Sequence, residues 1–216
     1  MGICRDGMAR GRFRNRRWSS LQLPEVDEIL LPSACAALYR RSMLEETGFF
    51  DDDFFAYAED TDLGLRGRLA GWEAVLASSA VVYHKYSQTG GSFSPFKVHL
   101  VERNHYWAAL KTFPPGWLLL LPWATAVRYA VQVQAICTGS GTGGEFRESG
   151  SRIRIGGALL RGMAEAMLGM PGMLGKRRRI MRTRKITTHA MAQLLRRHQV
   201  GFRELLDQVP ADGDRK

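Results

Sequence analysis

The segment GFFDDDFFAYAEDTDLGLRGRLAGW, residues 48–72, carries the clearest structural signals of this chain. Its first half is acidic and aromatic, and its second half carries leucines that recur on one side of a helix. Acidic residues favour the first turn of a helix, and glycine favours the position just after the last turn. We therefore predict a helix that begins near Glu59 or Thr61 and ends at Gly71.

The flanking segments predict an alternation of strands and helices. Residues 26–39 are apolar, which indicates a buried strand, a tight turn and a second short strand. Residues 74–86 contain β-branched side chains and predict a further strand with His84 at its end. Helices are predicted within residues 40–48 and over residues 97–112. The fold class is therefore α/β.

The composition changes after residue 113. Residues 117–135 are the most apolar part of the chain, but Pro122 and Arg128 interrupt them, so we expect them to lie in a membrane interface rather than cross it. Glycine and serine then predict a linker. Two amphipathic helices are predicted after it, over residues 155–173 and 176–206. We divide the chain into a basic loop (1–25), a main part (26–113), an interfacial segment (114–137), a linker (138–151) and a basic helical tail (152–208).

Charge and composition limit the function classes. The chain has 216 residues, of which 45% are hydrophobic, so it can bury a sizeable core. Lys and Arg total 31 against 21 Asp and Glu, and the net charge of +10 favours an anionic partner. The three cysteines are scattered, which argues against a disulfide framework or a thiolate zinc site.

A cluster of carboxylates among aromatic residues is the strongest candidate for chemistry. Aromatic walls exclude water, which raises the pKa of a carboxyl group and suits it to act as a general base. The alternative is that these carboxylates only complement the helix dipole. The cluster comprises Asp51, Asp52, Asp53, Glu59, Asp60 and Asp62, with Phe49, Phe50, Phe54, Phe55 and Tyr57 between them.

The order of motifs over residues 30–115 resembles the C-terminal half of family 2 inverting glycosyltransferases, particularly bacterial rhamnosyltransferase-like members. The motifs are an Arg-Arg pair, a Gly-Phe-Phe-Asp turn, a Phe-x-Tyr-x-Glu-Asp-x-Asp-Leu stretch, an Arg, a Gly-Trp pair and a strand that ends in His. They stand here at residues 40–41, 48–51, 55–63, 66, 71–72 and 84. The resemblance implies the C-terminal portion of a GT-A fold followed by amphipathic helices.

The resemblance also implies roles for single residues. Asp60 matches the catalytic base, which removes the proton of the acceptor hydroxyl, and Glu59 would position it or hold an acceptor hydroxyl. His84 matches a histidine that completes a divalent metal site. The residues expected to bind substrate are Asp51, Tyr57, Arg66 and Trp72.

Plainer roles stay open for three of these residues. Arg66 is also placed to form an ion pair with Asp62, four residues earlier on the helix. Trp72 also suits the core or its rim, and a single histidine after a strand is often structural.

The resemblance implies that a nucleotide-binding half ending in Asp-x-Asp is missing from this chain. Residues 51–53 are acidic but follow the Gly-Phe-Phe turn, so their order places them in the acceptor loop. We therefore interpret the chain as a fragment that is inactive by itself. A divalent metal, Mn²⁺ or Mg²⁺, is expected only together with the missing half.

The implied partners are a nucleotide-sugar donor and a glycan or lipid-linked acceptor of the cell envelope. The basic run at residues 176–185 contains no aromatic side chain to stack on a base, so an anionic membrane is a better partner than nucleic acid. We expect peripheral attachment to the cytoplasmic face of the cell membrane. The alternatives are a non-catalytic module that binds a membrane or nucleic acid, and a catalytically dead scaffold.

Overall fold

The computed structural model describes residues 1–13, 16, 20–84, 94–139 and 152–206, and it is mixed α/β and mostly helical. Its short strands are β1 (Gly2–Ile3), β2 (Ala9–Arg10), β3 (Val26–Glu28) and β4 (Val75–Ala77). Its α-helices are α1 (Arg41–Thr47), α2 (Glu59–Leu69), α3 (Pro95–Thr112), α4 (Pro115–Leu119), α5 (Leu121–Thr138), α7 (Arg152–Leu168), α8 (Met170–Thr183) and α9 (Thr188–Arg197). Turns of 3-10 helix are η2 (Ala34–Ala36), η3 (Asp52–Phe54) and η4 (Phe202–Leu206).

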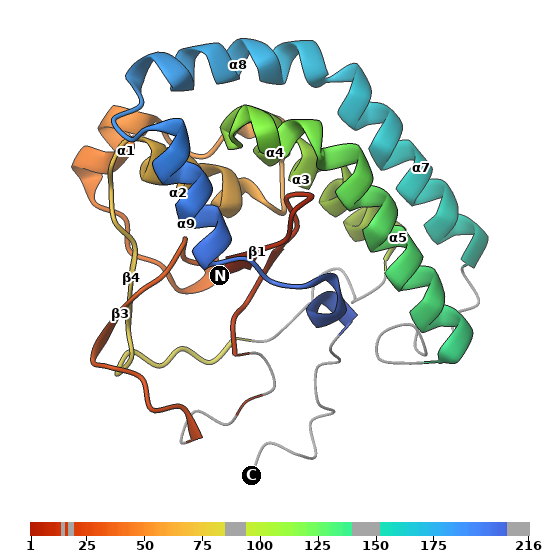
Figure 1. Cartoon of the computed structure of the whole chain (residues 1–216), viewed down its shortest axis with the longest axis horizontal. Coiled ribbons are helices and arrows are strands. Elements are labelled where there is room, and N and C mark those ends of the chain that lie inside the picture. Colours follow the sequence, from red (N-terminus) through yellow and green to blue (C-terminus); the bar gives the residue numbers. More distant parts are fainter. Residues whose placement is uncertain (14–15, 17–19, 85–93, 140–151, 207–216) are drawn as a thin grey trace.

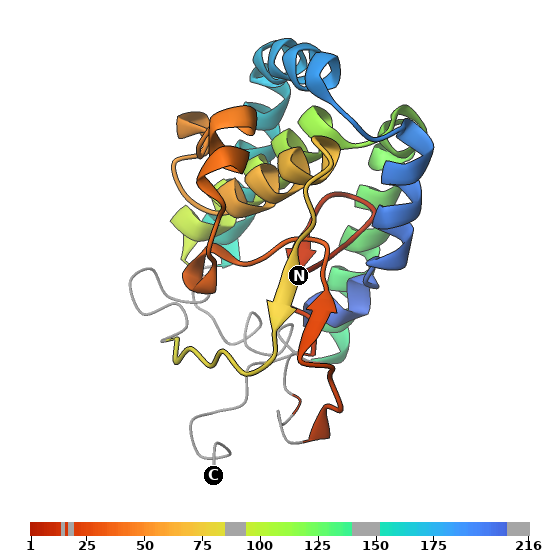
Figure 2. The same cartoon turned by 90° about the vertical axis from the view of Figure 1, so that its left-hand side faces the viewer.

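Helix α3 runs through the middle of the molecule, and the other helices surround it. Helices α7 and α8 form an arc over α3, and α5 lies on the side opposite β3 and β4 (Figures 1 and 2). Helix α9 lies closer to these strands, and its Arg197 is 3.2 Å from Glu28 of β3. Each of the two sheets in the described part has two antiparallel strands, β1 with β2 and β3 with β4. The sheets are therefore minor, and helix packing dominates the fold.

Three of the predicted helices are confirmed. Helix α1 ends at Thr47, and Gly48 caps it with a φ of 82°, which suits glycine. Helix α2 begins at Glu59, as predicted, and ends two residues before Gly71. Helix α3 covers the predicted residues 97–112 and begins two residues earlier, because Ser94 caps it by accepting a hydrogen bond from the Lys97 N–H at 3.2 Å.

The strand predictions were too long. No described strand follows β3 within residues 29–39, where the η2 turn stands instead of the second short strand. Strand β4 ends at Ala77, because a turn closed by a 3.1 Å bond from the Ala80 N–H to the Ala77 carbonyl follows it. His84 is therefore exposed and lies seven residues beyond the strand that was expected to end at it.

The start of the predicted basic loop is an ordered hairpin. Gly7 makes its turn with a φ of 97° and lies so close to the His105 carbonyl that an added Cβ would be 2.7 Å from it. Ile3 exchanges backbone hydrogen bonds with His198 and Val200, so the first strand joins the last part of the described chain. The prediction missed this hairpin because the residues that hold it in place, such as His105, His198 and Val200, are far away in the sequence.

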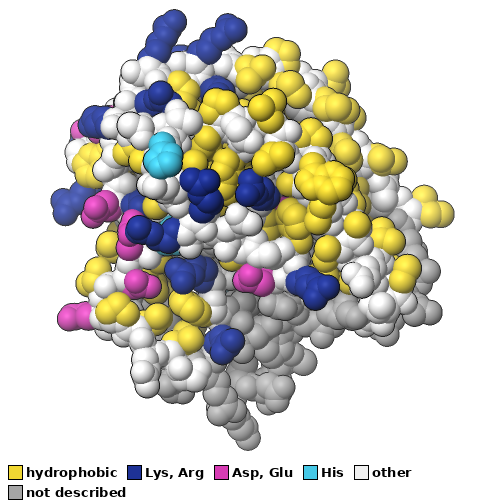
Figure 3. Space-filling view, in the orientation of Figure 1, with side chains coloured by type: hydrophobic (Ala, Val, Ile, Leu, Met, Phe, Trp, Pro, Cys, Tyr) yellow, Lys and Arg dark blue, Asp and Glu magenta, His cyan; other side chains and the backbone are white. Residues whose placement is uncertain are grey.

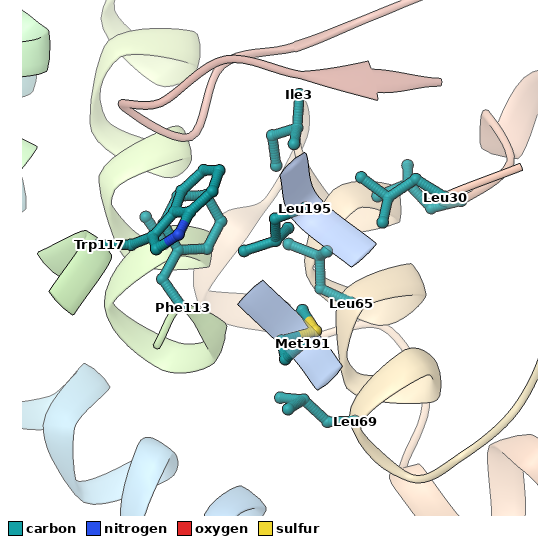
Figure 4. Packing of buried hydrophobic residues seen from close by; sticks show 10 residues of the cluster. Ile3, Leu30, Leu65, Leu69, Phe113, Trp117, Met191 and Leu195 are labelled. Atoms are coloured by element: carbon teal, nitrogen blue, oxygen red, sulfur yellow. The ribbon is translucent and has the colours of Figure 1, made fainter. Parts of the chain in front are cut away.

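The main hydrophobic core joins both ends of the described chain. It combines the hairpin, α2, the α3–α4 corner and α9, whose Met191 and Leu195 lie one turn apart and face inward (Figure 4). Phe113 and Trp117 meet edge to face with their ring centres 5.5 Å apart. The core residues are Ile3, Leu30, Leu31, Leu65, Leu69, Ala109, Phe113, Trp117, Met191 and Leu195.

The C-terminal segment is three helices rather than the two predicted. Gly169 separates α7 from α8, and an added Cβ there would lie 2.5 Å from the Trp107 ring. Thr187 then caps α9 by accepting a hydrogen bond from the Ala190 N–H at 3.1 Å. Most of the predicted linker, residues 140–151, and the last residues, 207–216, lie outside the described part.

The apolar segment after residue 113 forms α4 and α5. Trp117 is buried in the main core, while Trp123 is 71% exposed. Among the described helices, none combines the length and the apolar character needed to cross a membrane.

Candidate active site

Two adjacent carboxylates stand in the first turn of α2. Asp60 accepts a hydrogen bond from the Ala34 N–H through Oδ2 at 3.1 Å, which ties the helix start to the η2 turn. Glu59 has a buried Oε2 without a hydrogen-bond partner in the described part. Burial raises the pKa of Glu59, its own backbone N–H lowers it, and the charge of Asp60 raises it further. The pair therefore combines an anchored carboxylate, Asp60, with a carboxyl group, Glu59, that holds its proton more readily than an ordinary glutamate does.

The loop that delivers these carboxylates has a strained backbone. Phe55, Tyr57 and Ala58 have φ values of 61°, 67° and 63°, in the left-handed region that side chains other than glycine rarely adopt. Such residues cost about 1–3 kcal/mol each and persist only where the surroundings enforce them. The loop is therefore held in place by contacts from elsewhere.

Asn104 on α3 provides those contacts. Its buried side-chain amide donates to the carbonyls of Phe54, Ala56 and Tyr57 at 2.9, 2.8 and 2.8 Å. Arg103 adds bonds to the carbonyls of Asp53 and Phe54 at 3.0 and 3.1 Å. Neither residue was among the predicted site residues, because an Arg-Asn pair within a helix gives no sign of which loop it meets.

We expect Asn104→Leu to destabilise the protein by about 2–4 kcal/mol, because it leaves three carbonyls of the loop without their common donor. Urea denaturation measures this. Gln134→Leu, at an exposed position of α5, is the matched control and should change the free energy of unfolding by less than about 0.5 kcal/mol. A loss below about 1 kcal/mol for Asn104→Leu would show that the loop holds its shape unaided.

Tyr39 is a further residue of the site that sequence reasoning missed. Its hydroxyl is buried without a hydrogen-bond partner in the described part. Burial raises the pKa of Tyr39 to about 12, and the negative charges of Asp60 and Glu59 add to this effect. Its ring meets Phe50 edge to face with the centres 6.1 Å apart. A hydroxyl donor and an aromatic side chain therefore lie beside the two carboxylates.

The aromatic residues form an open rim rather than the expected closed wall. Phe54 is fully buried, but Phe49 and Phe55 are 68% and 78% exposed. Phe55 meets Phe96 edge to face at 6.2 Å between ring centres. Exposed rings beside carboxylates can stack against an apolar face of a ligand such as a sugar ring.

Asp51 is bound to two lysines inside the protein. Its Oδ2 lies 2.6 Å from Lys111 Nζ, and its Oδ1 lies 2.5 Å from Lys176 Nζ. Lys111 also contacts Asp62 at 2.7 Å, and Lys176 contacts Asp53 at 2.6 Å. Burial by itself would raise the pKa of Asp51, but the bonds from both lysines outweigh it and lower the pKa to about 2. Lys176, from the predicted basic tail, thus holds the acidic loop.

This arrangement predicts how Asp51 contributes to stability as the pH changes. Its folded-state pKa is about 2 and its ordinary value is 3.8, so the unfolded chain takes up the proton first as the pH falls. We expect Asp51→Asn to cost about 1–2 kcal/mol at pH 6, and this difference from the unmodified protein to halve by about pH 3. Urea unfolding at several pH values measures it. A difference that stays constant with pH would contradict the prediction.

Arg66 has internal partners at each of its guanidinium nitrogens. Its Nε donates to Asp62 at 2.8 Å, as the alternative interpretation of the sequence expected. Its Nη1 donates to the carbonyls of Thr47 and Gly48, and its Nη2 donates to the Phe49 carbonyl at 2.7 Å. Arg66 therefore fixes the turn that precedes the acidic loop, and its contact with a substrate stays a prediction.

The structure does not bring Trp72 to the carboxylate pair. Trp72 follows the far end of α2, and a helix of 11 residues places its two ends about 16 Å apart. The Trp72 Nε1–H donates to Glu46 at 2.9 Å. Tyr57, by contrast, lies two residues before the pair, and the centre of its ring is 5.7 Å from Lys97 Nζ.

The described residues do not form a metal centre. Among them, no group of three or more His, Cys, Asp or Glu side chains could hold a metal ion. His84 is one of the described residues and belongs to no such group. The acidic side chains of Asp51 and Asp53 already pair with Lys176. The residues described here therefore do not by themselves hold a divalent cation, and the cation implied by the resemblance together with the missing half stays a prediction.

Comparison with known proteins identifies a partial relative. A segment of 59 residues is 46% identical to N-acetylglucosaminyl-diphospho-decaprenol L-rhamnosyltransferase of Mycobacterium tuberculosis, in the strains CDC 1551 / Oshkosh and ATCC 25618 / H37Rv. The match spans 27% of this chain and 19% of the length of each relative. No protein-family model and no solved structure matches the chain. The match supports a glycosyltransferase-like relationship.

Proposed function

We propose that this chain supplies the acceptor-side part of an inverting glycosyltransferase of family 2 with a GT-A fold. One observation carries the proposal: in a chain similar to a rhamnosyltransferase, a strained loop held by Asn104 presents Glu59 and Asp60 at a helix start. Strained backbones gather at functional sites. The substrates proposed are a nucleotide-activated sugar such as L-rhamnose and a lipid-linked acceptor of the cell envelope.

In this proposal Asp60 accepts the proton of an acceptor hydroxyl. The hydroxyl oxygen then forms a bond to the anomeric carbon of the donor sugar, and the bond from that carbon to the diphosphate breaks with its electron pair on the leaving group. Asp60 is oriented for this by its bond to the Ala34 N–H. Glu59, with its raised pKa and its free Oε2, would hold an acceptor hydroxyl, and the exposed phenylalanines would contact the acceptor sugar.

A divalent cation would stabilise the charge of the diphosphate leaving group. Because the described residues do not offer a metal site, we propose that such an ion, and the donor contacts with it, depend on residues outside this set.

The test has an activity arm and a binding arm. The longest native reading frame that contains these 216 residues should transfer labelled L-rhamnose from its nucleotide-activated form to N-acetylglucosaminyl-diphospho-decaprenol, the acceptor named in the relative. The 216-residue chain should bind this acceptor more tightly than the decaprenyl diphosphate without the sugar. Failure of both arms would overturn the proposal. Transfer of a different sugar would show that the proposed donor, nucleotide-activated L-rhamnose, is wrong.

A further inference from the structure

Helix α5 has its charge inside and its apolar side chains outside. Arg128, the one charged residue in its sequence, is 1% exposed; it pairs with Glu102 at 2.7 Å and with Asp6. A helix on the surface of a water-soluble protein normally shows the opposite arrangement. The exposed positions of α5 are Pro122, Trp123, Ala126, Ala130, Val133, Gln134, Cys137 and Thr138, and only two of these side chains are hydrogen-bonding amides or hydroxyls.

Helix α7 also has large apolar side chains on its outer side, and small residues on the side that faces the protein. An added Cβ on Gly162 would lie 2.7 Å from the His99 carbonyl, so α7 packs closely on α3 through the side of α7 that carries small residues. Small residues allow the same close approach between helices in membranes. Large apolar side chains stand outside at intervals of seven residues, or two turns: Ile153, Leu160, Met167 and, on α8, Leu174 are 92%, 70%, 62% and 38% exposed.

The apolar surface continues into a basic one. On α8, Leu174, Arg178 and Arg182 follow each other at intervals of four residues and lie on one side of the helix. Hydrophobic side chains gather over α5 and along α7, and basic side chains lie at the α8 side of the same face (Figure 3). Every exposed charged side chain among the described side chains of α5, α7 and α8 belongs to an arginine.

We propose that the outer surfaces of α5, α7 and the start of α8 form one lipid-binding face, which inserts into the headgroup region of an anionic bilayer. We call it the α5–α7 face. Exposed aromatic and aliphatic side chains would enter the acyl boundary, and the arginines would contact anionic headgroups. A second copy of the chain is a poorer occupant, because Glu165 is the only carboxylate on α5, α7 and α8 and already pairs with Arg161 and His99, which leaves no free carboxylate there for the arginines of a partner. The proposal is independent of the transferase function.

Vesicle sedimentation of the 216-residue chain tests the proposal. We expect binding to vesicles of phosphatidylcholine with 30 mol% phosphatidylglycerol to exceed binding to pure phosphatidylcholine at least fivefold. Leu160→Glu with Met167→Glu should weaken binding to the anionic vesicles at least tenfold. The matched control, Val81→Glu with Val82→Glu, changes the charge equally at exposed apolar positions outside the helices and should bind within twofold of the unmodified chain.

Two further measurements separate the contributions of the face. Arg178→Gln with Arg182→Gln should weaken binding to the anionic vesicles at least fivefold and leave binding to pure phosphatidylcholine unchanged. Brominated lipids should quench tryptophan fluorescence in the unmodified chain, and Trp123→Phe should remove most of that quenching.

Three results would overturn the proposal. Equal loss of binding in the Leu160/Met167 and Val81/Val82 variants would show an effect of charge alone. The unmodified chain could instead form dimers and fail to bind vesicles. If Leu160→Glu with Met167→Glu dissociated these dimers, a second copy of the chain would be the occupant of the face. Equal binding to DNA and to anionic vesicles at matched salt would show general attraction of polyanions by the arginines.

Discussion

Asp60→Asn is expected to lower sugar transfer by a factor of about 10² to 10⁴, the usual contribution of a general base. Asparagine keeps an oxygen that can accept the hydrogen bond from the Ala34 N–H, so the start of α2 should keep its structure. Binding of the acceptor should change little, because the substitution removes proton acceptance and not the shape of the site. Steady-state kinetics of the longest native reading frame measure kcat and KM separately.

The control for this prediction comes from the same loop. Asp52 is exposed and has no hydrogen bond or ion pair from its side chain in the described part, so Asp52→Asn should keep transfer within about twofold. Glu59→Gln should mainly raise KM for the acceptor, since Glu59 is proposed to hold a hydroxyl. If Glu59→Gln instead lowered kcat more than Asp60→Asn, the roles of the two carboxylates would be reversed.

Arg128→Met is expected to cost about 3–5 kcal/mol of stability, the largest loss among these substitutions. It would leave Asp6 and Glu102, which are 0% and 1% exposed, without their shared guanidinium partner. Burying uncompensated charge is far more costly than losing the ion pair itself. Urea denaturation measures the loss, and Arg196→Met, at an exposed position of α9, should change stability by less than about 0.5 kcal/mol.

A triple variant separates lost packing from uncompensated charge. Asp6→Asn with Glu102→Gln and Arg128→Met removes all three charges and should recover at least half of the stability that Arg128→Met loses. A triple variant as unstable as Arg128→Met would mean that the shape of the arginine side chain, rather than its charge, holds the hairpin and α5 on α3.

The raised pKa of Glu59 and the anchoring of Asp60 come from tertiary contacts that no motif reveals. The sequence placed the two carboxylates correctly in the first turn of α2. It did not indicate that Tyr39 approaches them, because the tyrosine precedes them by about 20 residues in a segment that was expected to be a strand. It also did not indicate the internal partners of Asp51 and Arg66, which are lysine side chains and backbone carbonyls, and the substrate roles of these two residues stay predictions.

The local elements could be predicted from the sequence: α2 and α3 to within two residues at each end, the glycine that caps α1, and the position of the carboxylate pair. Helix periodicity and capping depend on residues within about four positions of each other, so they can be read directly from the chain. Which distant residues meet is visible only in the folded chain. Arg128 pairs with Asp6 across 122 residues, and Lys176 reaches Asp51 across 125. Such pairs are set by the packing of helices, and no spacing along the chain encodes them.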